Sequence, residues 1–556
     1  MLMTGAQAIV ASLVKEGVDT VFGYPGGTIL PLFDALCGSP VRHVLTVHEQ
    51  GAAHAADGYA RASGRVGVCI ATSGPGATNL VTGLAAAFMD SVPVVAITGQ
   101  VQTTLIGRDA FQEIDITGIT MPITKHNFLV KDISKLPETL WRAFNIARSG
   151  RPGPVLVDIP RDVQSQKHDF TDIEAVYSRS TLVRQSPDLP DLIKKAAEAI
   201  SAAKRPAIIA GGGCISANAG AALTRFVEQC NLPVVTTLMG IGAFPGGHDK
   251  LLGMTGLHGL KAANRAVYEA DVLIVTGSRF NDRVTGDRTS YAAGKTIIHI
   301  DIDPAEVHKN VDAAVPLVGE MNMILQELTE AVNPGDLSSW WSTIWQWQQE
   351  YDAPIADDML TAPLVMQELN RQIGDQDVIY VTDVGQHQMW AAQHLSVKTP
   401  RGFLSSGGLG AMGFGLPAAL GAQLARPDKR VIHIVGDGGL KMTGCELYTI
   451  SAEQLPVISI VINNKSLGMV RQLQHCFFEK RYANSLLPMP MDFSAFAAAF
   501  GIPAAVTNTP AEFAEALTAA WQRQGPGLIV ANIATDDLVT PMIAPGGAMD
   551  EYVVID

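Results

Sequence analysis

The chain has 556 residues, with 54 acidic and 40 basic side chains, so its formal net charge is −14 at pH 7. At roughly 100 to 200 residues per domain, this length predicts about three or four domains. The acidic balance, without clustered lysines and arginines, argues against a sequence-independent nucleic-acid binder, because phosphate contacts need basic clusters. Apolar residues make up 47% of the chain, which excludes disorder, and charged residues only 17%. Because soluble domains average roughly 25% charged residues, we expect large cores, a subunit interface or both.

The N-terminus and the cysteines indicate a cytoplasmic protein. Residues 1–18 lack the basic start, apolar run and small-residue cleavage site of an export signal. Two uncharged stretches, 66–89 and 402–425, are broken by glycine and proline, so they predict buried strands, turns and helices rather than membrane spans. The absence of any CxxC pair predicts reduced thiols buried in the core. The six cysteines are Cys37, Cys69, Cys214, Cys230, Cys445 and Cys476.

Short apolar runs alternate with helix-sized stretches along the chain. Continuous runs of this length are typical of parallel strands that crossover helices bury on both faces. The fold class is therefore predicted to be α/β. The predicted strands are Val66–Thr72, Val92–Thr98, Val155–Ile159, Ala207–Ala210, Val272–Thr276, Ile297–Asp301, Val378–Thr382, Val431–Val435 and Val457–Ile462.

Two polar stretches interrupt this alternation and are predicted to be linkers. They lie at about Gln164–Asp188 and Asn333–Asp358. The predicted domains are therefore residues 1–165, 186–335 and 359–556.

The first and third parts share an internal echo. Residues 68–76 form a predicted strand that ends in a small-residue turn, and Pro93 stands 19 residues after Gly74. Residues 431–438 repeat the pattern, and Pro456 stands 19 residues after Asp437. Two ordinary strand-turn-helix units could agree by coincidence. Alternatively, two similar α/β domains hold one ligand at the carboxyl ends of their strands.

The most specific local pattern is Gly436-Asp437-Gly438, followed after 24 residues by Asn463-Asn464. Both motifs end predicted strands, so neighbouring parallel strands would bring a carboxylate and a carboxamide together. Such oxygen ligands suit Mg²⁺, which completes its coordination shell with phosphate and water. Taken separately, each motif is also a common turn.

Glu49 is a second candidate because it precedes Gly51 and two alanines at the start of a predicted helix. In an apolar site such a carboxylate can exchange a proton with a bound group. The alternative is a carboxylate that only complements the helix dipole.

The middle part contains a weaker pattern. Gly211-Gly212-Gly213 follows one predicted strand and Asp301 ends another, as in a dinucleotide crevice, although a plain tight turn is about equally consistent. Arg279 and Arg283 suit phosphate or carboxylate recognition, or form a solvated loop. The sequence contains neither a GxSxG nor a GxxxxGK[ST] motif, which favours chemistry carried by a bound cofactor.

Seven motifs in order make the chain resemble, along almost its full length, the catalytic subunits of the acetohydroxyacid synthase (acetolactate synthase) family of thiamine-diphosphate enzymes. The matching motifs are Phe22–Gly27, His48–Ala53, Thr72–Asn79, Asp109–Glu113, Gly150–Asp158, Gly385–Trp390 and Gly407–Met412.

The resemblance implies three doubly wound parallel-sheet domains. The first would bind the pyrimidine of thiamine diphosphate, the central one FAD, and the third the diphosphate with Mg²⁺. Active sites would lie at a dimer interface of a homodimer or homotetramer, with a possible small regulatory subunit and no nucleic-acid or membrane partner. FAD would take no net redox part.

The resemblance also assigns roles to single residues. Glu49 would hydrogen-bond the aminopyrimidine ring and assist its proton transfer, and Met412 would force the bent shape of the cofactor. Phe111 and Gln112 would lie beside the reacting carbon. The Mg²⁺ ligands would be Asp437, Asn464 and the backbone carbonyl of Ser466. Further thiamine-diphosphate contacts would be Gly385, Gln386, His387, Gly436, Gly438, Gly439, Leu467, Gly468 and Met469. FAD contacts would be Arg151, Gly211, Gly212, Gly213, Thr237, Leu238, His258, Gly277, Arg279, Arg283 and Asp301.

The implied activity is a transferase reaction of branched-chain amino acid (isoleucine and valine) biosynthesis. Two pyruvate molecules would yield 2-acetolactate and CO₂, and pyruvate with 2-ketobutyrate would yield 2-aceto-2-hydroxybutyrate. Arg283 would meet the acceptor carboxylate. Leu473 replaces the usual tryptophan of the acceptor pocket, which predicts a weaker preference for 2-ketobutyrate.

Two further departures concern the flavin region, namely Asn281 in place of an aspartate and Leu257 where methionine is common. Rival interpretations are a flavin-independent catabolic acetolactate synthase, a pyruvate decarboxylase or a pyruvate oxidase. A non-catalytic scaffold is disfavoured because Glu49 and the Mg²⁺ ligands are present.

Overall fold

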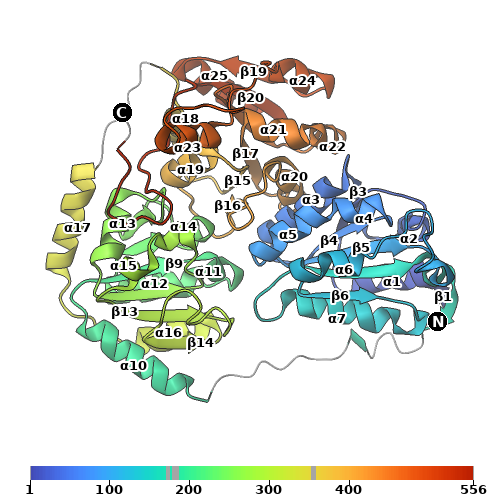
Figure 1. Cartoon of the computed structure of the whole chain (residues 1–556), viewed down its shortest axis with the longest axis horizontal. Helices are drawn as coiled ribbons and strands as arrows, with labels where there is room; N and C mark the ends of the chain where they lie inside the picture. Colours follow the sequence, from blue (N-terminus) through green and yellow to red (C-terminus); the bar gives the residue numbers. More distant parts are fainter. Residues whose placement is uncertain (1, 171–175, 178–186, 352–358, 555–556) are drawn as a thin grey trace.

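A computed structural model describes residues 2–170, 176–177, 187–351 and 359–554 (Figure 1). It contains three six-stranded sheets, all of whose strand pairings are parallel, and helices cover the faces of each sheet. The predicted α/β class with three parallel-sheet domains is confirmed. All nine predicted strands are present, with ends shifted by at most a few residues.

The first domain is built on a sheet with the strand order β3-β2-β4-β5-β7-β6, and β1 pairs with β8 in a separate antiparallel ribbon. Its strands are β1 (Leu2–Thr4), β2 (Thr20–Gly23), β3 (Arg42–Leu45), β4 (Gly67–Ala71), β5 (Val94–Gln100), β6 (His126–Leu129), β7 (Val155–Pro160) and β8 (Lys167–Asp169). Its helices are α1 (Gly5–Lys15), α2 (Leu30–Leu36), α3 (Glu49–Ser63), α4 (Pro75–Asn79), α5 (Val81–Met89), α6 (Ile116–Thr120), α7 (Leu136–Arg148) and α8 (Arg161–Ser165).

The central domain has the strand order β11-β10-β9-β12-β13-β14. Its strands are β9 (Pro206–Ala210), β10 (Val234–Thr236), β11 (Leu251–Met254), β12 (Val272–Thr276), β13 (Thr296–Asp301) and β14 (Val315–Val318). Its helices are α10 (Leu189–Ala202), α11 (Gly212–Ser216), α12 (Gly220–Cys230), α13 (Lys261–Glu269), α14 (Asp282–Thr285), α15 (Arg288–Ala292), α16 (Met321–Ala331) and α17 (Ser338–Tyr351).

The third domain has the strand order β16-β15-β17-β18-β20-β19. Its strands are β15 (Val378–Thr382), β16 (Phe403–Leu404), β17 (Arg430–Gly436), β18 (Ile458–Asn463), β19 (Ala504–Thr507) and β20 (Gly527–Asn532). Its helices are α18 (Ala362–Ile373), α19 (Gln386–His394), α20 (Gly415–Ala425), α21 (Asp437–Thr443), α22 (Leu447–Ala452), α23 (Gly468–Phe477), α24 (Phe493–Ala499) and α25 (Pro510–Gln522), and the 3₁₀ turn η5 spans Gly444–Glu446.

The first and third sheets have the same topology. In chain order their six strands are arranged second, first, third, fourth, sixth and fifth across the sheet in both domains, whereas the central sheet follows a different order. The echo predicted from the sequence therefore reflects two similar domains.

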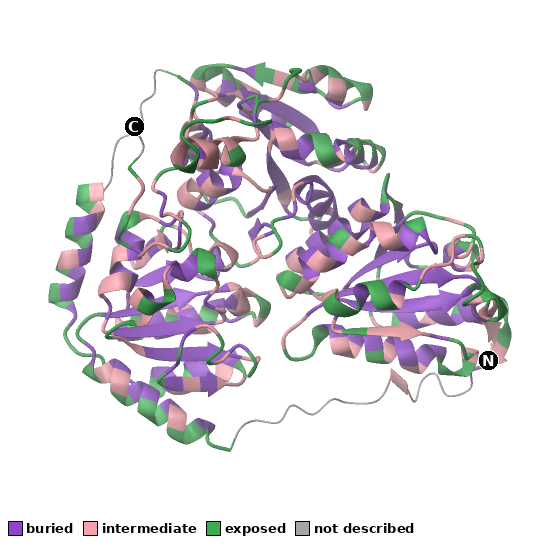
Figure 2. Ribbon diagram, viewed as in Figure 1, coloured by how far each residue is buried: buried purple, intermediate pink, exposed green. Residues whose placement is uncertain are grey.

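Helices α3 and α20 join these two domains through a common core. Both helices are rich in alanine and glycine, and Gly58 and Gly421 lie so close to the partner helix that a side chain on either would collide with its backbone. One apolar cluster includes Phe22 and Leu84 of the first domain together with Leu420 and Val461 of the third. The burial pattern in Figure 2 shows the strands of the sheet interiors as buried and the outer helix faces as exposed.

The second predicted linker is wrong in part. Residues 338–351 form α17, which runs along the outside of the central domain in Figure 1. Trp340 and Trp341 are buried in the central core, and their indole nitrogens donate to the carbonyls of Pro206 (3.0 Å) and Asn231 (2.9 Å). The apolar area of the tryptophans outweighs the polar residues around them. Most of the first predicted linker lies outside the described residues.

The cysteine prediction is also wrong in part. Cys69, Cys214 and Cys230 are buried, but Cys37 and Cys445 are exposed, and all six are free thiols. The uncharged stretches 66–89 and 402–425 form strands, turns and helices as predicted. None of the helices within the described ranges has the length and hydropathy needed to cross a membrane.

Candidate functional site

The carboxyl edge of the third sheet holds the candidate cofactor site. Strands β15 and β17 are neighbours there, and the chain leaves them toward opposite sides of the sheet, which opens a crevice at their ends. Gly385 follows β15 and Asp437 follows β17 directly. Gly385 has φ +147, a conformation that favours glycine.

Asp437 begins α21 and is 2% exposed. Its Oδ1 accepts from the Gly438 N–H (2.8 Å), whereas its buried Oδ2 has no hydrogen-bond partner in the described chain. Burial raises the pKa of Asp437 to about 6. Asn464 is buried beside it, its Oδ1 accepts from the Ser466 N–H (3.2 Å), and its Nδ2 donates to Gln386 Oε1 (3.0 Å). An unpartnered carboxylate oxygen next to a carboxamide fits a hard cation such as Mg²⁺.

A cavity collects the residues that the sequence assigned to the diphosphate and metal. Its walls come from the ends of β15, β17 and β18 and from the starts of α19, α21 and α23. The predicted residues that line it are Gly385, Gln386, His387, Met412, Gly436, Asp437, Gly438, Gly439, Asn464, Ser466, Leu467, Gly468 and Met469. Gly468 leaves no room for a side chain, which would collide with Gln386 and Asn464.

His387 is a neutral base in this cavity. It is 5% exposed, burial lowers its pKa to about 3, and its buried Nε2 has no hydrogen-bond partner in the described chain. An uncharged imidazole nitrogen near Asp437 can therefore serve a bound polar group.

Two residues that support the cavity were not predicted from the sequence. Asp383 is 1% exposed and accepts from the N–H groups of Gly413 (3.0 Å) and Gly415 (2.9 Å), which fixes the turn after Met412. Its signal was a carboxylate directly after a predicted strand. Gln472 is fully buried, and its Oε1 accepts from Gln386 Nε2 (2.9 Å); no sequence signal indicated this contact.

Glu49 lies elsewhere in the chain. It begins α3, is 9% exposed, and its Oε2 accepts from Asn79 Nδ2 (3.0 Å). Glu49 does not line the cavity of Asp437. The two similar domains of a single chain therefore do not bring these two carboxylates into one cavity.

Phe111 and Gln112 also belong to the first domain. Phe111 is 87% exposed, and Gln112 has φ +60 and lies against Gly74 in the turn after β4. The Glu113 carboxylate holds this loop by accepting from the N–H groups of Ala110 (3.1 Å) and neighbouring residues. The predicted reacting residues thus form two sets, one in the first domain and one around Asp437.

The predicted acceptor residues are not brought into the cavity. Leu473 is partly buried on α23, and the Arg283 side chain is 64% exposed, with its Nε 3.6 Å from Asp282 Oδ2. Neither residue lines the cavity of Asp437.

The central sheet has a second crevice, between β9 and β12, where the strand order reverses. Gly211 and Gly213 follow β9 and pack against Gly277 after β12 so closely that a side chain on any of them would collide with backbone. Asp301 ends β13, is 8% exposed, and its pKa is raised by burial to about 6. The glycines after β9 allow a ligand to approach the backbone closely, and Asp301 lies two strands away at the end of β13. This combination fits a dinucleotide.

The remaining predicted flavin contacts come from several segments of the chain. The Thr237 hydroxyl accepts from the Gly240 N–H (3.2 Å), Leu238 follows it, and Gly212 begins α11. Burial lowers the pKa of His258 to about 4. Cationic groups come from two domains: Arg151 Nη1 donates to Glu306 Oε1 (2.6 Å), and Arg279 Nη2 donates to the Met89 carbonyl (2.7 Å).

The two departures in this region have structural roles. Asn281 caps α14, because its Oδ1 accepts from the Val284 N–H (3.1 Å), a function that asparagine and aspartate perform equally well. Leu257 is 4% exposed and packs in the central core.

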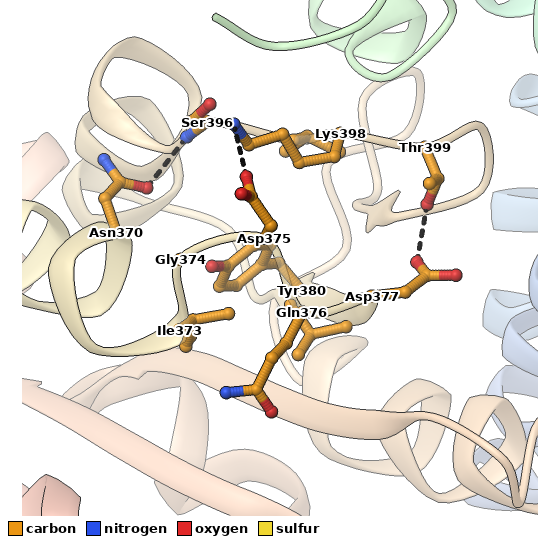
Figure 3. A pocket seen from close by; sticks show the side chains of 12 residues that line it. Asn370, Ile373, Gly374, Asp375, Gln376, Asp377, Tyr380, Ser396, Lys398 and Thr399 are labelled. Carbon is orange, nitrogen blue, oxygen red and sulfur yellow. Dashed lines mark hydrogen bonds and ion pairs between the residues drawn. The ribbon is translucent and has the colours of Figure 1, made fainter.

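A different pocket lies at the opposite, amino edge of the third sheet (Figure 3). Its volume is about 180 Å³, and its walls include Asp375, Tyr380 and Lys398. None of the predicted site residues lines this pocket, so it is separate from the candidate cofactor site.

Three family profiles described as thiamine pyrophosphate enzyme match the chain in order. The N-terminal TPP binding domain matches residues 3–119, the central domain 193–328, and the C-terminal TPP binding domain 383–531.

The chain is also similar to named proteins over nearly its full length. It is 47% identical to the probable acetolactate synthase large subunit of Methanocaldococcus jannaschii, over 99% of this chain and 95% of that protein. It is 46% identical to the acetolactate synthase isozyme 2 large subunit of Escherichia coli, over 99% of both chains. The identity to the acetolactate synthase large subunit of Corynebacterium glutamicum is 46%, over 98% of this chain and 89% of that protein.

Proposed function

Because this chain belongs to the family of the acetolactate synthase large subunits, we propose that it condenses two 2-keto acids with loss of CO₂. Pyruvate is the donor, and pyruvate or 2-ketobutyrate is the acceptor, so the products are 2-acetolactate and 2-aceto-2-hydroxybutyrate. The observation that carries this proposal is the cavity around Asp437, in which an unpartnered buried carboxylate oxygen lies among the glycine-rich ends of parallel strands.

The third domain would hold thiamine diphosphate through Mg²⁺. Asp437, Asn464 and the carbonyl of Ser466 supply the oxygen ligands, and Met412 supplies an apolar wall. When bound, thiamine diphosphate would supply a nucleophilic carbon for the keto group and an electron sink for the decarboxylation. The Glu49 carboxylate moves a proton at the aminopyrimidine, and Arg283 binds the acceptor carboxylate.

A second copy of the chain would complete the site. Glu49, Phe111 and Gln112 do not line the cavity of Asp437 in their own chain, so they would face the cavity of a partner. Large exposed apolar side chains on the helices after Asp437 support such an interface, namely Met442 (60% exposed), Tyr448 (56%) and Val470 (44%).

FAD would bind at the crevice of the central sheet. Gly211, Gly213 and Gly277 would let the diphosphate of FAD approach the protein backbone, and Asp301 would accept a hydrogen bond from a ribose hydroxyl. Arg151 and Arg279 supply positive charge.

The designation of the relatives as large subunits supports a smaller regulatory partner, and the reaction fits a cytoplasmic enzyme. Leu473 leaves the acceptor pocket with less aromatic surface, which weakens selection for 2-ketobutyrate.

The test is product analysis with the purified protein, pyruvate, thiamine diphosphate and Mg²⁺, with and without FAD. We expect 2-acetolactate as the product when all cofactors are present. We also expect the Glu49→Gln variant to fold but to turn over pyruvate orders of magnitude more slowly. Acetaldehyde or acetate as the main product would contradict the proposal. Acetolactate formed by flavin-free protein would assign the chain to a flavin-independent synthase.

A further inference from the structure

Glu446 is a buried carboxylate that reaches from the third domain into the first. It ends η5 and is 2% exposed. Its Oε1 accepts from the N–H groups of Val47 (3.1 Å) and His48 (3.2 Å), and its Oε2 lies 2.8 Å from the Thr449 hydroxyl. The two backbone donors directly precede Glu49.

The first turn of α3 packs closely against this carboxylate. Gly51, on the first turn of α3, has no space for a side chain, because a Cβ there would collide with the Glu446 carboxylate. The Thr449 hydroxyl also lies 3.3 Å from the Leu45 carbonyl, at the end of β3, so its single proton can be donated to either acceptor. Glu446 and Thr449 therefore contact the connection between β3 and α3 at Leu45, Val47 and His48. Burial raises the pKa of Glu446, and its hydrogen bonds oppose that rise.

We infer that Glu446 is a positioning residue for Glu49, which fixes the backbone ahead of α3 so that the Glu49 carboxylate meets the cofactor in a productive orientation. The inference rests on the proposed role of Glu49. A displacement of a reacting group by about 1 Å can lower a rate by about a hundredfold, so a loosened segment before α3 is expected to affect turnover more than substrate binding.

Two substitutions of Glu446 separate the effect of its hydrogen bonds from the effect of its charge. In Glu446→Gln the amide oxygen can still accept from Val47 and His48, and the amide NH₂ can donate to Thr449, whose hydroxyl remains free to donate to Leu45. In Glu446→Ala both backbone N–H groups lose their acceptor.

The experiment compares these variants in the full chain by two measurements. Amide hydrogen exchange of residues 45–50 without cofactor reports the local structure, and kcat and KM for pyruvate report turnover. For Glu446→Ala we expect faster exchange at Val47 and His48 and a kcat lowered by about tenfold or more at similar KM. For Glu446→Gln we expect both measurements to stay close to those of the original protein.

Asp271 provides a matched control, because its carboxylate also accepts from two successive N–H groups, those of Lys204 (2.8 Å) and Arg205 (3.0 Å) in the central domain. Asp271→Ala should speed amide hydrogen exchange at Lys204 and Arg205 and leave kcat unchanged. If Glu446→Ala does not fold, Glu446→Asp, which is one methylene shorter, replaces it with the same expectations.

Unchanged exchange in the Ala or Asp variant, or faster exchange with unchanged kcat, would overturn the inference. A tenfold loss in Glu446→Gln with normal exchange would also overturn it, because charge rather than position would then matter. If the original protein forms no acetolactate, the proposed function fails, and the exchange data still report whether Glu446 holds the segment.

Discussion

Asp158 is a buried carboxyl group in the first domain whose environment is set by two side chains. It lies on β7, is 1% exposed, and accepts from Thr98 Oγ1 (2.7 Å) and Gln100 Nε2 (2.9 Å). Gln100 also donates to the Ile114 carbonyl (2.9 Å). The network thus connects the sheet to the loop that carries Phe111.

Burial raises the pKa of Asp158 from 3.8 to about 7. The folded protein therefore binds this proton more tightly than the unfolded chain, and the contribution of Asp158 to stability falls as the pH rises from about 4 to about 7. Asp158→Asn lacks this proton equilibrium. Between pH 5 and 8 we expect the stability of the original protein to fall by about 2 to 3 kcal/mol relative to the variant. Urea unfolding at both pH values measures the difference, and a pH-independent difference would exclude the ionisation.

The chemistry of single residues was predictable where a strand ended in a polar side chain. Asp437 and Asn464 follow buried parallel strands, so sequence placed them together at one sheet edge. Gln472 and Glu446 gave no such signal, because their importance depends on contacts with residues remote in sequence. Glu446 meets Val47 only after two domains have packed together.

Helices α3 and α20 depend on close contact between their backbones. Gly58 lies against Ala418, so an added methyl group would force the helices apart. Alanine favours a helix over glycine by about 1 kcal/mol, but overpacking costs about 1 to 3 kcal/mol.

We therefore expect Gly58→Ala to lower the free energy of unfolding, despite the better helix propensity. Denaturant unfolding measures this change. Gly525→Ala serves as the control, since no atom lies near its added Cβ, and it should be close to neutral. Equal stability of the two variants would show that the helices can separate without cost.

Secondary structure was predictable for strands because their apolar runs are continuous, and β4, β12 and β17 appear where the sequence indicated. Helix α17 was not predicted, because its polar composition suggested a linker. Three of its four tryptophans, Trp340, Trp341 and Trp347, supply the burial instead. The ring centroids of Trp340 and Trp347 lie 5.5 Å apart in an edge-to-face arrangement.

At the scale of the whole molecule, the repeated topology of the first and third sheets was visible in the sequence as an echo, but its use was not. The echo suggested that two similar domains hold a ligand together, without indicating whether both come from one chain. Glu49 does not line the cavity of Asp437 in the same chain, and the repeat alone does not state which copy supplies each half of a site.

The distribution of apolar cores has a consequence for how the molecule melts. The first and third domains share one core through α3 and α20. The central core consists mostly of central-domain residues, with Ile543 and Met549 of the C-terminal tail, and two central-domain residues, Ile241 and Met254, pack in a further cluster of the third domain. A shared core couples unfolding, and a separate core allows an independent transition.

Scanning calorimetry should therefore resolve two transitions, one from the central domain and one from the other two domains melting together. A ligand raises only the transition of the unit that it binds, so added FAD should shift the first and added thiamine diphosphate with Mg²⁺ the second. A single transition that both ligands shift equally would mean that the chain melts as one cooperative unit. With two transitions, the protein would lose its central domain to heat while the paired domains that carry Glu49 and Asp437 remain folded.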